Sequence, residues 1–386
     1  MAPTLLSLPL EIIEHIAALA DPQEMPKLRL LNRECAEKVK RTFVREHFTE
    51  RAFLLCNEDS LRTLLAIVEH DELGRALRHV AFGTDIVRDM AHECSQLEME
   101  GLTPSGCREE KQQYLEHARL SQAQDRFLDG RGELHLLVTI FARLRTYRNP
   151  IILTLLGWDE ATDRVRGRSH MENAVGWRRM TNCEGDDAIA TILEALTLAM
   201  LPLTGFLVPE EGFWSSPYNL SCNKDLMKNA RVVFPNLGVL QYHYDDENLE
   251  ETPAGGDVAD VSSLISECKA LETLVLGKIG QPWSSTLHIE NGPRFIEALL
   301  QQTLQSLKVV MLRGFDVPLD LLTSFAERHG LTRIDLCQCR LYIVGHMNCV
   351  RIRKILGADV DAGLENVLGA VQSLKVVNMT ENSLRA

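Results

Sequence analysis

Near the amino terminus, apolar residues recur at three- and four-residue steps in two stretches, a pattern that predicts amphipathic helices. The apolar residues of the first stretch are Ile12, Ile13, Ile16, Leu19 and Ala20. Pro9 suits the first turn of this helix, and Asp21-Pro22 ends it because proline cannot continue the hydrogen-bond ladder. A second apolar stripe covers residues 25–39. We expect two or three short helices within about forty residues, too few to bury a stable core alone.

Farther along the chain, the apolar pattern changes to L-x-x-L-x-L-x-x-N/C-x-L or parts of it. Copies begin at Leu77, Leu237, Leu271, Leu307, Leu331 and Leu374. Alternating apolar residues predict short strands with one face on the core. The last five copies start 34, 36, 24 and 43 residues apart, whereas regular repeats of this type run about 20–29 residues. We therefore expect an irregular array with insertions.

Helical stripes precede these strands. The clearest ones lie at residues 258–265, 295–300, 318–325 and 364–371, with Gly330 as the expected C-cap of the third. Asp186 or Asp187 is expected to cap another helix that reaches Met200. Polar or loop-like stretches at residues 85–133, 157–187 and 244–256 are expected to be insertions or linkers. A domain of parallel strands without repeats would share part of this pattern.

The amino-terminal residues resemble an F-box. The resemblance rests on Leu8-Pro9-x-Glu11-Ile12-Ile13-x-x-Ile16-x-x-Leu19, Asp21-Pro22 and Leu28-Arg29-Leu30-Leu31. In that family the helices dock on the Skp-type adaptor of a cullin–RING ubiquitin ligase. The resemblance implies that the adaptor or a small F-box core is contacted by Leu8, Pro9, Ile12, Ile13, Ile16, Leu28 and Leu31. Two departures from the pattern, Pro26 and Cys35, could weaken docking. The alternative is an ordinary helical hairpin that packs on the rest of the chain.

The later copies resemble degenerate leucine-rich repeats, and the whole chain resembles a fungal-type F-box protein. We therefore predict an α/β fold in which a helical F-box precedes an irregular leucine-rich-repeat solenoid of helix–strand units. The predicted boundaries are residues 1–48 for the F-box, 49–135 for a helical linker with the first irregular repeats, and 136–386 for the repeat domain.

Charge, apolar runs and cysteine spacing limit the partners and the cellular location that we expect. The chain has 54 acidic and 41 basic residues and a net charge of -13, which argues against partners that are nucleic acids or anionic membranes. A signal peptide is not expected, since Glu11 comes too soon and no basic segment precedes it. Residues 192–208 are shorter than the ~20 apolar residues of a membrane span. Ten irregularly spaced cysteines favour reduced, mostly buried thiols. We expect a cytoplasmic or nuclear protein.

A search for catalytic chemistry finds little. The sequence lacks G-x-x-x-x-G-K-[ST], G-x-G-x-x-G, H-E-x-x-H and G-x-S-x-G. Ser221-Cys-Asn-Lys224 matches S-x-x-K without its companion motifs. Zinc binding by Cys337, Cys339, Cys349 and His346, or acid–base chemistry by His243, is a weaker interpretation than core thiols and a solvated loop. We expect no catalytic residue, metal or cofactor.

A group of arginines stands out on this acidic chain. Arg164, Arg166 and Arg168 could contact an acidic or phosphorylated segment of a target protein, because guanidinium groups suit such anions. The resemblance then implies a non-catalytic substrate receptor of an SCF-type ubiquitin ligase, which binds its target on the repeat surface. The alternatives are a leucine-rich scaffold without a ligase role and, less favoured, a hydrolase whose site is assembled from distant residues.

Overall fold

The computed structural model describes residues 8–19, 24–87, 108–156, 165–166, 168–169, 171, 180–182, 185–208, 224–245, 262, 264–279, 292–342 and 349–358. They form a mixed α/β protein with parallel strands, as expected. The chain divides into two compact units: unit 1 holds Met1–Cys183 and Ala195–Pro202, and unit 2 holds Glu184–Glu194 and Leu203–Ala386. Helix α10 (Gly185–Ala199) contributes residues to both units. The three-part division predicted from the sequence stays a prediction.

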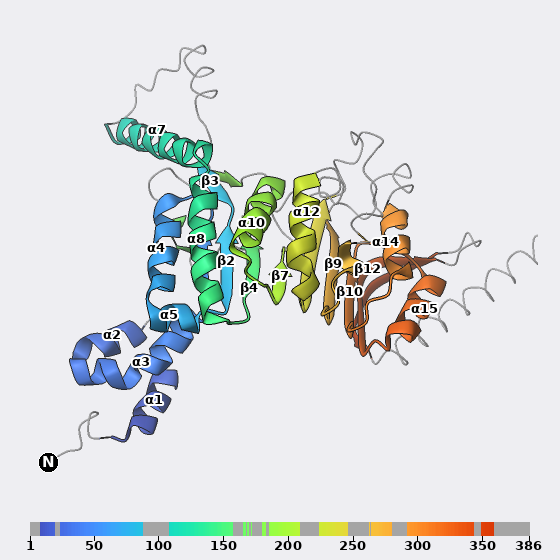
Figure 1. The fold of residues 1–386 in the computed structure, drawn as a ribbon, viewed down its shortest axis with the longest axis horizontal. Helices are drawn as coiled ribbons and strands as arrows, with labels where there is room; N and C mark the ends of the chain where they lie inside the picture. Colours follow the sequence, from blue (N-terminus) through green and yellow to red (C-terminus); the bar gives the residue numbers. More distant parts are fainter. Residues whose placement is uncertain are drawn as a thin grey trace, which may run out of the picture. The chain divides into compact units, whose positions relative to one another are not determined.

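Unit 1 begins with three helices (Figure 1). They are α1 (Leu10–Leu19), α2 (Met25–Leu31) and α3 (Arg33–Phe48). Their number and order agree with the prediction of two or three short helices. The break between α2 and α3 falls at Asn32, which is extended and whose side chain accepts a hydrogen bond from the backbone N–H of Cys35 at 2.8 Å. The side chain thereby satisfies a backbone donor that the first turn of α3 leaves open.

Four parallel strands follow in unit 1, in the order β4-β2-β1-β5. Their bounds are β1 (Glu50–Leu54), β2 (His79–Gly83), β4 (Ile152–Leu156) and β5 (Val165–Arg166). The accompanying helices are α4 (Glu58–Glu69), α5 (Asp71–Ala76) and α8 (Gly132–Tyr147). The Phe82 ring of β2 meets the Phe141 ring of α8 edge-on at 6.4 Å between centroids, and both side chains are fully buried. This contact fastens α8 to the sheet.

The polar stretch predicted as an insertion contains a long helix. Helix α7 (Arg108–Asp129) lies beside a two-stranded antiparallel pair, β3 (Asp85–Val87) and β6 (Met180–Asn182). The Gln124 side chain receives a hydrogen bond from the backbone N–H of Val87 at 3.0 Å. The helix is therefore attached to β3 by a polar contact.

Unit 2 is built on six further strands in the order β11-β12-β10-β9-β8-β7, with β13 antiparallel to β12. Their bounds are β7 (Gly205–Leu207), β8 (Val239–Asp245), β9 (Thr273–Ile279), β10 (Val309–Arg313), β11 (Asp316–Pro318), β12 (Arg333–Tyr342) and β13 (Cys349–Ala358). The pairs among the first six strands are parallel. The copies that begin at Leu237, Leu271, Leu307 and Leu331 each place a strand two residues after that leucine.

The apolar positions of successive copies lie in register. Leu240 is paired with Leu274, Leu274 with Val310, and Val310 with Ile334, one position from each copy. All four side chains are buried. Because strand side chains alternate between faces, this register places one apolar face of the sheet in the core.

The start of each of these strands is held by the same pair of hydrogen bonds. The backbone N–H groups of two consecutive residues both donate to one carbonyl, which belongs to the residue just before the neighbouring strand. The accepting carbonyls belong, in order, to Thr204, Gly238, Glu272 and Lys308. The same geometry occurs in unit 1, where Arg78 and His79 both donate to Thr49.

The helices of unit 2 lie alongside its strands (Figure 1). Their buried side chains are mostly apolar. They are α12 (Lys224–Val233), followed by the 3₁₀ turn η3 (Phe234–Asn236), then α14 (Gly292–Gln301) and α15 (Leu319–His329). Gly330 ends α15 with a positive φ of 58°, where its N–H donates to the Glu327 carbonyl. The predicted glycine C-cap is thus confirmed.

Several sequence expectations differ from the structure. Helix α10 starts at Gly185, so Asp186 and Asp187 lie in its first turn instead of capping it. The N/C position of such a pattern suits a tight turn, but Cys339, which occupies it in the copy that begins at Leu331, lies within β12, because that strand continues to pair with β11 and β13. The copy at Leu374 lies outside the described residues. Within the described part of the chain, no helix is both long and apolar enough to cross a membrane.

Candidate functional site

The three amino-terminal helices share a small core. Ile13 and Ala17 of α1 pack with Met25 of α2 and Val39 of α3. Leu8, Leu28 and Phe43 are partly buried against this cluster. The cluster is a single layer between short helices, so it can bury only one face of α1.

The other face of α1 and the end of α2 are apolar and exposed. Ile12 is 47% exposed, Ile16 is 39% exposed, and Leu31 is 63% exposed. The remaining large apolar side chains exposed on these helices are Leu10, Leu19 and Leu30. We call these six residues the apolar face. Single exposed apolar side chains are normal on a protein surface, whereas six of them on two short helices that share one small core make a candidate interaction surface.

The predicted adaptor-binding residues therefore divide between two environments. Ile12, Ile16 and Leu31 belong to the apolar face, and Pro9 beside it is exposed. Ile13 lies in the small core, while Leu8 and Leu28 are partly buried against it. Leu19 and Leu30 belong to the F-box pattern in the sequence but were not predicted to contact the adaptor. Leu10 was not singled out from the sequence.

The two departures from the F-box pattern have local explanations. Pro26 lies in the first turn of α2, where a missing N–H interrupts no helical hydrogen bond. Cys35 is buried in the first turn of α3. Both residues are thus compatible with the helices that carry the apolar face.

The three predicted substrate-contact arginines lie in different settings. Arg164 is outside the described residues, and Arg166 is exposed on β5. Arg168 is only 6% exposed, and its guanidinium lies 3.9 Å from a carboxylate oxygen of the buried Asp85. The Arg168 side chain therefore lies in the interior of unit 1 and not on its surface, and its assignment as a substrate contact stays a prediction. The role of Arg166 stays a prediction.

Cys268 and Cys339 of unit 2 are buried, whereas Cys337 is partly exposed and His346 lies outside the described residues. Burial raises the pKa of the Cys268 thiol to about 12 and that of Cys339 to about 11, so both are protonated at neutral pH. A buried thiol of this kind is a poor nucleophile and a poor metal ligand. Among the residues that the structure describes, no group of three or more His, Cys, Asp or Glu residues could hold a metal ion.

His243 was weighed as an acid–base residue, and the structure buries it. Its Nδ1 atom lies 3.0 Å from the Val208 carbonyl, and burial lowers its pKa although this hydrogen bond opposes the shift. The imidazole lies against Gly277 of the neighbouring strand, so closely that a side chain at residue 277 would overlap it. We interpret His243 as a packing residue of the sheet.

Comparison with known proteins finds no match: no family model and no curated protein corresponds to this chain. The functional assignment therefore depends on the residues and their geometry.

Proposed function

We propose that this chain is the substrate receptor of an SCF-type cullin–RING ubiquitin ligase. Its amino-terminal helices would form the F-box that docks to a Skp-type adaptor, and its body would be an irregular leucine-rich-repeat solenoid that binds a target protein. The chain would work in the cytoplasm or nucleus without a cofactor. Catalysis would belong to other subunits, while this one supplies proximity to the target.

The observation that carries this proposal is the apolar face of α1 and α2. A hairpin that only capped the rest of the chain would bury these side chains, because the hydrophobic effect favours removing them from water. Instead, Ile12, Ile16 and Leu31 are exposed while the neighbouring Ile13 is buried. The small core holds the helices together, and the remaining apolar side chains are left for a partner.

The repeat-like features of unit 2 support the second half of the proposal. The apolar positions of four copies lie in register, and each strand starts with two hydrogen bonds to a single carbonyl. Stacked helix–strand repeats would have both features. Stacked repeats commonly present an extended binding surface.

The experiment is co-purification of the full chain with a Skp-type adaptor. An Ile12→Asp, Ile16→Asp variant is expected to lose the complex, since two carboxylates would be desolvated at the interface. The matched control is Leu198→Asp, Val232→Asp, which adds the same charge at apolar residues that are exposed on α10 and α12.

Circular dichroism should show that both variants remain folded. Retention of the adaptor by the Ile12→Asp, Ile16→Asp variant, or no capture by the native chain, would rule out docking through the apolar face.

A further inference from the structure

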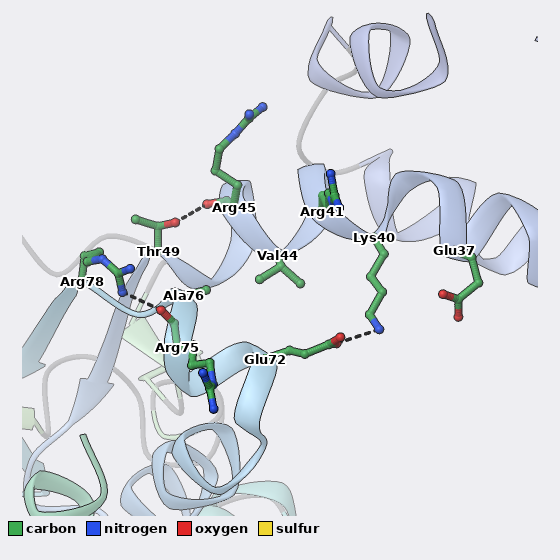
Figure 2. A pocket seen from close by; sticks show the side chains of 10 residues that line it. All are labelled: Glu37, Lys40, Arg41, Val44, Arg45, Thr49, Glu72, Arg75, Ala76 and Arg78. Carbon is green, nitrogen blue, oxygen red and sulfur yellow. Dashed lines mark hydrogen bonds and ion pairs between the residues drawn. The ribbon is translucent and has the colours of Figure 1, made fainter. Parts of the chain in front are cut away.

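A groove in unit 1 lies between α3 and α5, away from the residues of the apolar face. Its volume is about 660 Å³, within the range of sites that hold small ligands or short peptide segments. Figure 2 shows the side chains that line it: Glu37, Lys40, Arg41, Val44, Arg45, Thr49, Glu72, Arg75, Ala76 and Arg78. We call this the basic groove.

The charge of the basic groove is opposite to that of the chain. Five cationic side chains and two carboxylates line it, while the whole protein carries a net charge of -13. Lys40 and Glu72 pair across it at 2.7 Å, and their hydrogen bond raises the pKa of Lys40 and lowers the pKa of Glu72. This pair joins the two walls of the groove and cancels one positive charge.

Three arginines of the groove keep their charge uncompensated. Arg41, Arg75 and Arg78 have no carboxylate within ion-pair distance among the residues that the structure describes. One terminal nitrogen of Arg78, Nη1, donates to the carbonyls of Arg75 and Leu77, which orients this side chain. The groove thus holds an excess of positive charge that the chain itself does not neutralise.

The spacing of the cations favours an extended chain as the ligand. Arg41 and Arg45 are one helical turn apart on α3, which corresponds to an axial step of about 6 Å. Arg45 also pairs with the exposed Glu46 at 3.0 Å. In an extended peptide, side chains on the same face are two residues apart, or about 6.6 Å. In Figure 2 the cationic side chains leave the groove walls in different directions instead of converging on one point. Such an arrangement suits several single charges along a chain better than one multiply charged group.

We propose that the basic groove binds an extended acidic segment of a partner protein, with carboxylates at alternate positions. The guanidinium groups would pair with the carboxylates. Val44 and Ala76 would contact the small residues in between. This inference goes beyond the proposed function, since it requires neither the adaptor nor a ligase.

The test measures peptide binding to the full chain by fluorescence anisotropy. The probe is a labelled peptide with glutamate at alternate positions. The comparison peptides replace each Glu with Gln, gather the same glutamates into one block, or carry a single phosphoserine in place of the glutamates. We expect the alternating peptide to bind most tightly, with an affinity that falls as salt is added.

A variant pair separates the groove from general electrostatics. Arg41→Ala, Arg75→Ala is expected to weaken binding of the alternating peptide about fivefold, as suits two exposed ion pairs. The control Arg62→Ala, Arg126→Ala removes the same charge from exposed arginines on α4 and α7 and should leave the affinity unchanged. Adaptor capture by the groove variant should also be unchanged, so failure here is distinct from failure of the proposed function.

The opposite results overturn the inference. Equal losses in both variants would show that only net charge matters. Equal binding of the glutamine peptide would exclude recognition of carboxylates, and equal binding of the block peptide would exclude the alternate spacing. Preference for the phosphoserine peptide would assign the groove to phosphate instead, and no binding of any peptide would leave it without this ligand.

Discussion

Helices α1 and α2 of unit 1 and helices α14 and α15 of unit 2 have similar amphipathic patterns but different environments. On α14 and α15, most of the large apolar residues are buried, including Ile296, Leu300 and Phe325. On α1 and α2, several residues of the same type are exposed. The difference lies in what the chain supplies: α14 and α15 have parallel strands to pack on, whereas α1 and α2 have only each other and α3. An amphipathic pattern therefore predicts which face of a helix is apolar, but not whether the same chain covers that face.

Truncating one apolar side chain in each region tests this difference in burial with the largest expected effect. Phe325→Ala should lower the free energy of unfolding by about 3–5 kcal/mol, because it leaves a cavity in a fully packed core. Leu19→Ala, at a residue that is 75% exposed, should change it by no more than about 0.5 kcal/mol. Urea denaturation of the full chain measures both, and similar losses would show that the apolar face is not free.

Adding volume tests the same contrast from the other side. Gly277→Ala should cost about 1–3 kcal/mol, because the new methyl group would overlap the His243 ring. The double variant with His243→Ala should cost less than the sum of the two single changes, since both act on one contact. Ala18→Leu on the exposed side of α1 is the control and should be tolerated. Additive losses in the urea experiment would contradict the contact.

The helix caps of unit 1 allow a smaller, local test. Asn32 and Asn57 each accept a backbone N–H at 2.8 Å, at the starts of α3 and α4. Replacing either with Ala should cost about 1 kcal/mol. Hydrogen exchange should show the loss at α3 for Asn32→Ala and at α4 for Asn57→Ala. Unchanged exchange at the first turn of α3 would mean that packing, not Asn32, sets its start.

The smallest effect concerns pH and unit 2. Because the pKa of His243 is lowered below its ordinary value of 6.5 in the folded protein, the unfolded chain takes up this proton first as the pH falls. The free energy of unfolding should therefore decrease as the pH drops below 6.5, until it passes the lowered pKa. His243→Asn, which can keep a donor near the Val208 carbonyl, should flatten this dependence. His15→Gln on α1 is the control, and an unchanged slope in His243→Asn would assign the dependence to other groups.

Local sequence patterns predicted where helices and strands occur better than they predicted which side chains are buried. The strands after Leu271, Leu307 and Leu331 could be located because apolar alternation is a local pattern that spans only a few residues. Which of Ile12 and Ile13 is buried could not, because both are β-branched apolar residues in one helical turn, and their difference depends on how α1 meets Met25 and Val39.

Long-range neighbours explain the remaining differences. Arg168 appeared to belong to a basic surface group, yet it is buried with its guanidinium 3.9 Å from Asp85, which lies 83 residues earlier in the chain. The basic groove likewise joins residues 37–49 to residues 72–78. Each segment alone carries only a small positive excess, +2 over residues 37–49 and +1 over residues 72–78, because carboxylates are interspersed in both, and the groove brings the two together.

The shared way of entering strands has a consequence for how this protein can change over evolutionary time. Thr204, Gly238, Glu272 and Lys308 each offer one carbonyl to the next strand, although the first donor of that strand lies 34, 34, 36 and 24 residues further along the chain. The position of each strand in the sheet is thus fixed by two hydrogen bonds at its first residues, not by the length of the segment that connects it to the preceding strand. Because loop closure costs rise only slowly with length, segments between strands can be lengthened, shortened or exchanged while the core keeps its alignment. The scaffold can in this way acquire new surface features without being rebuilt.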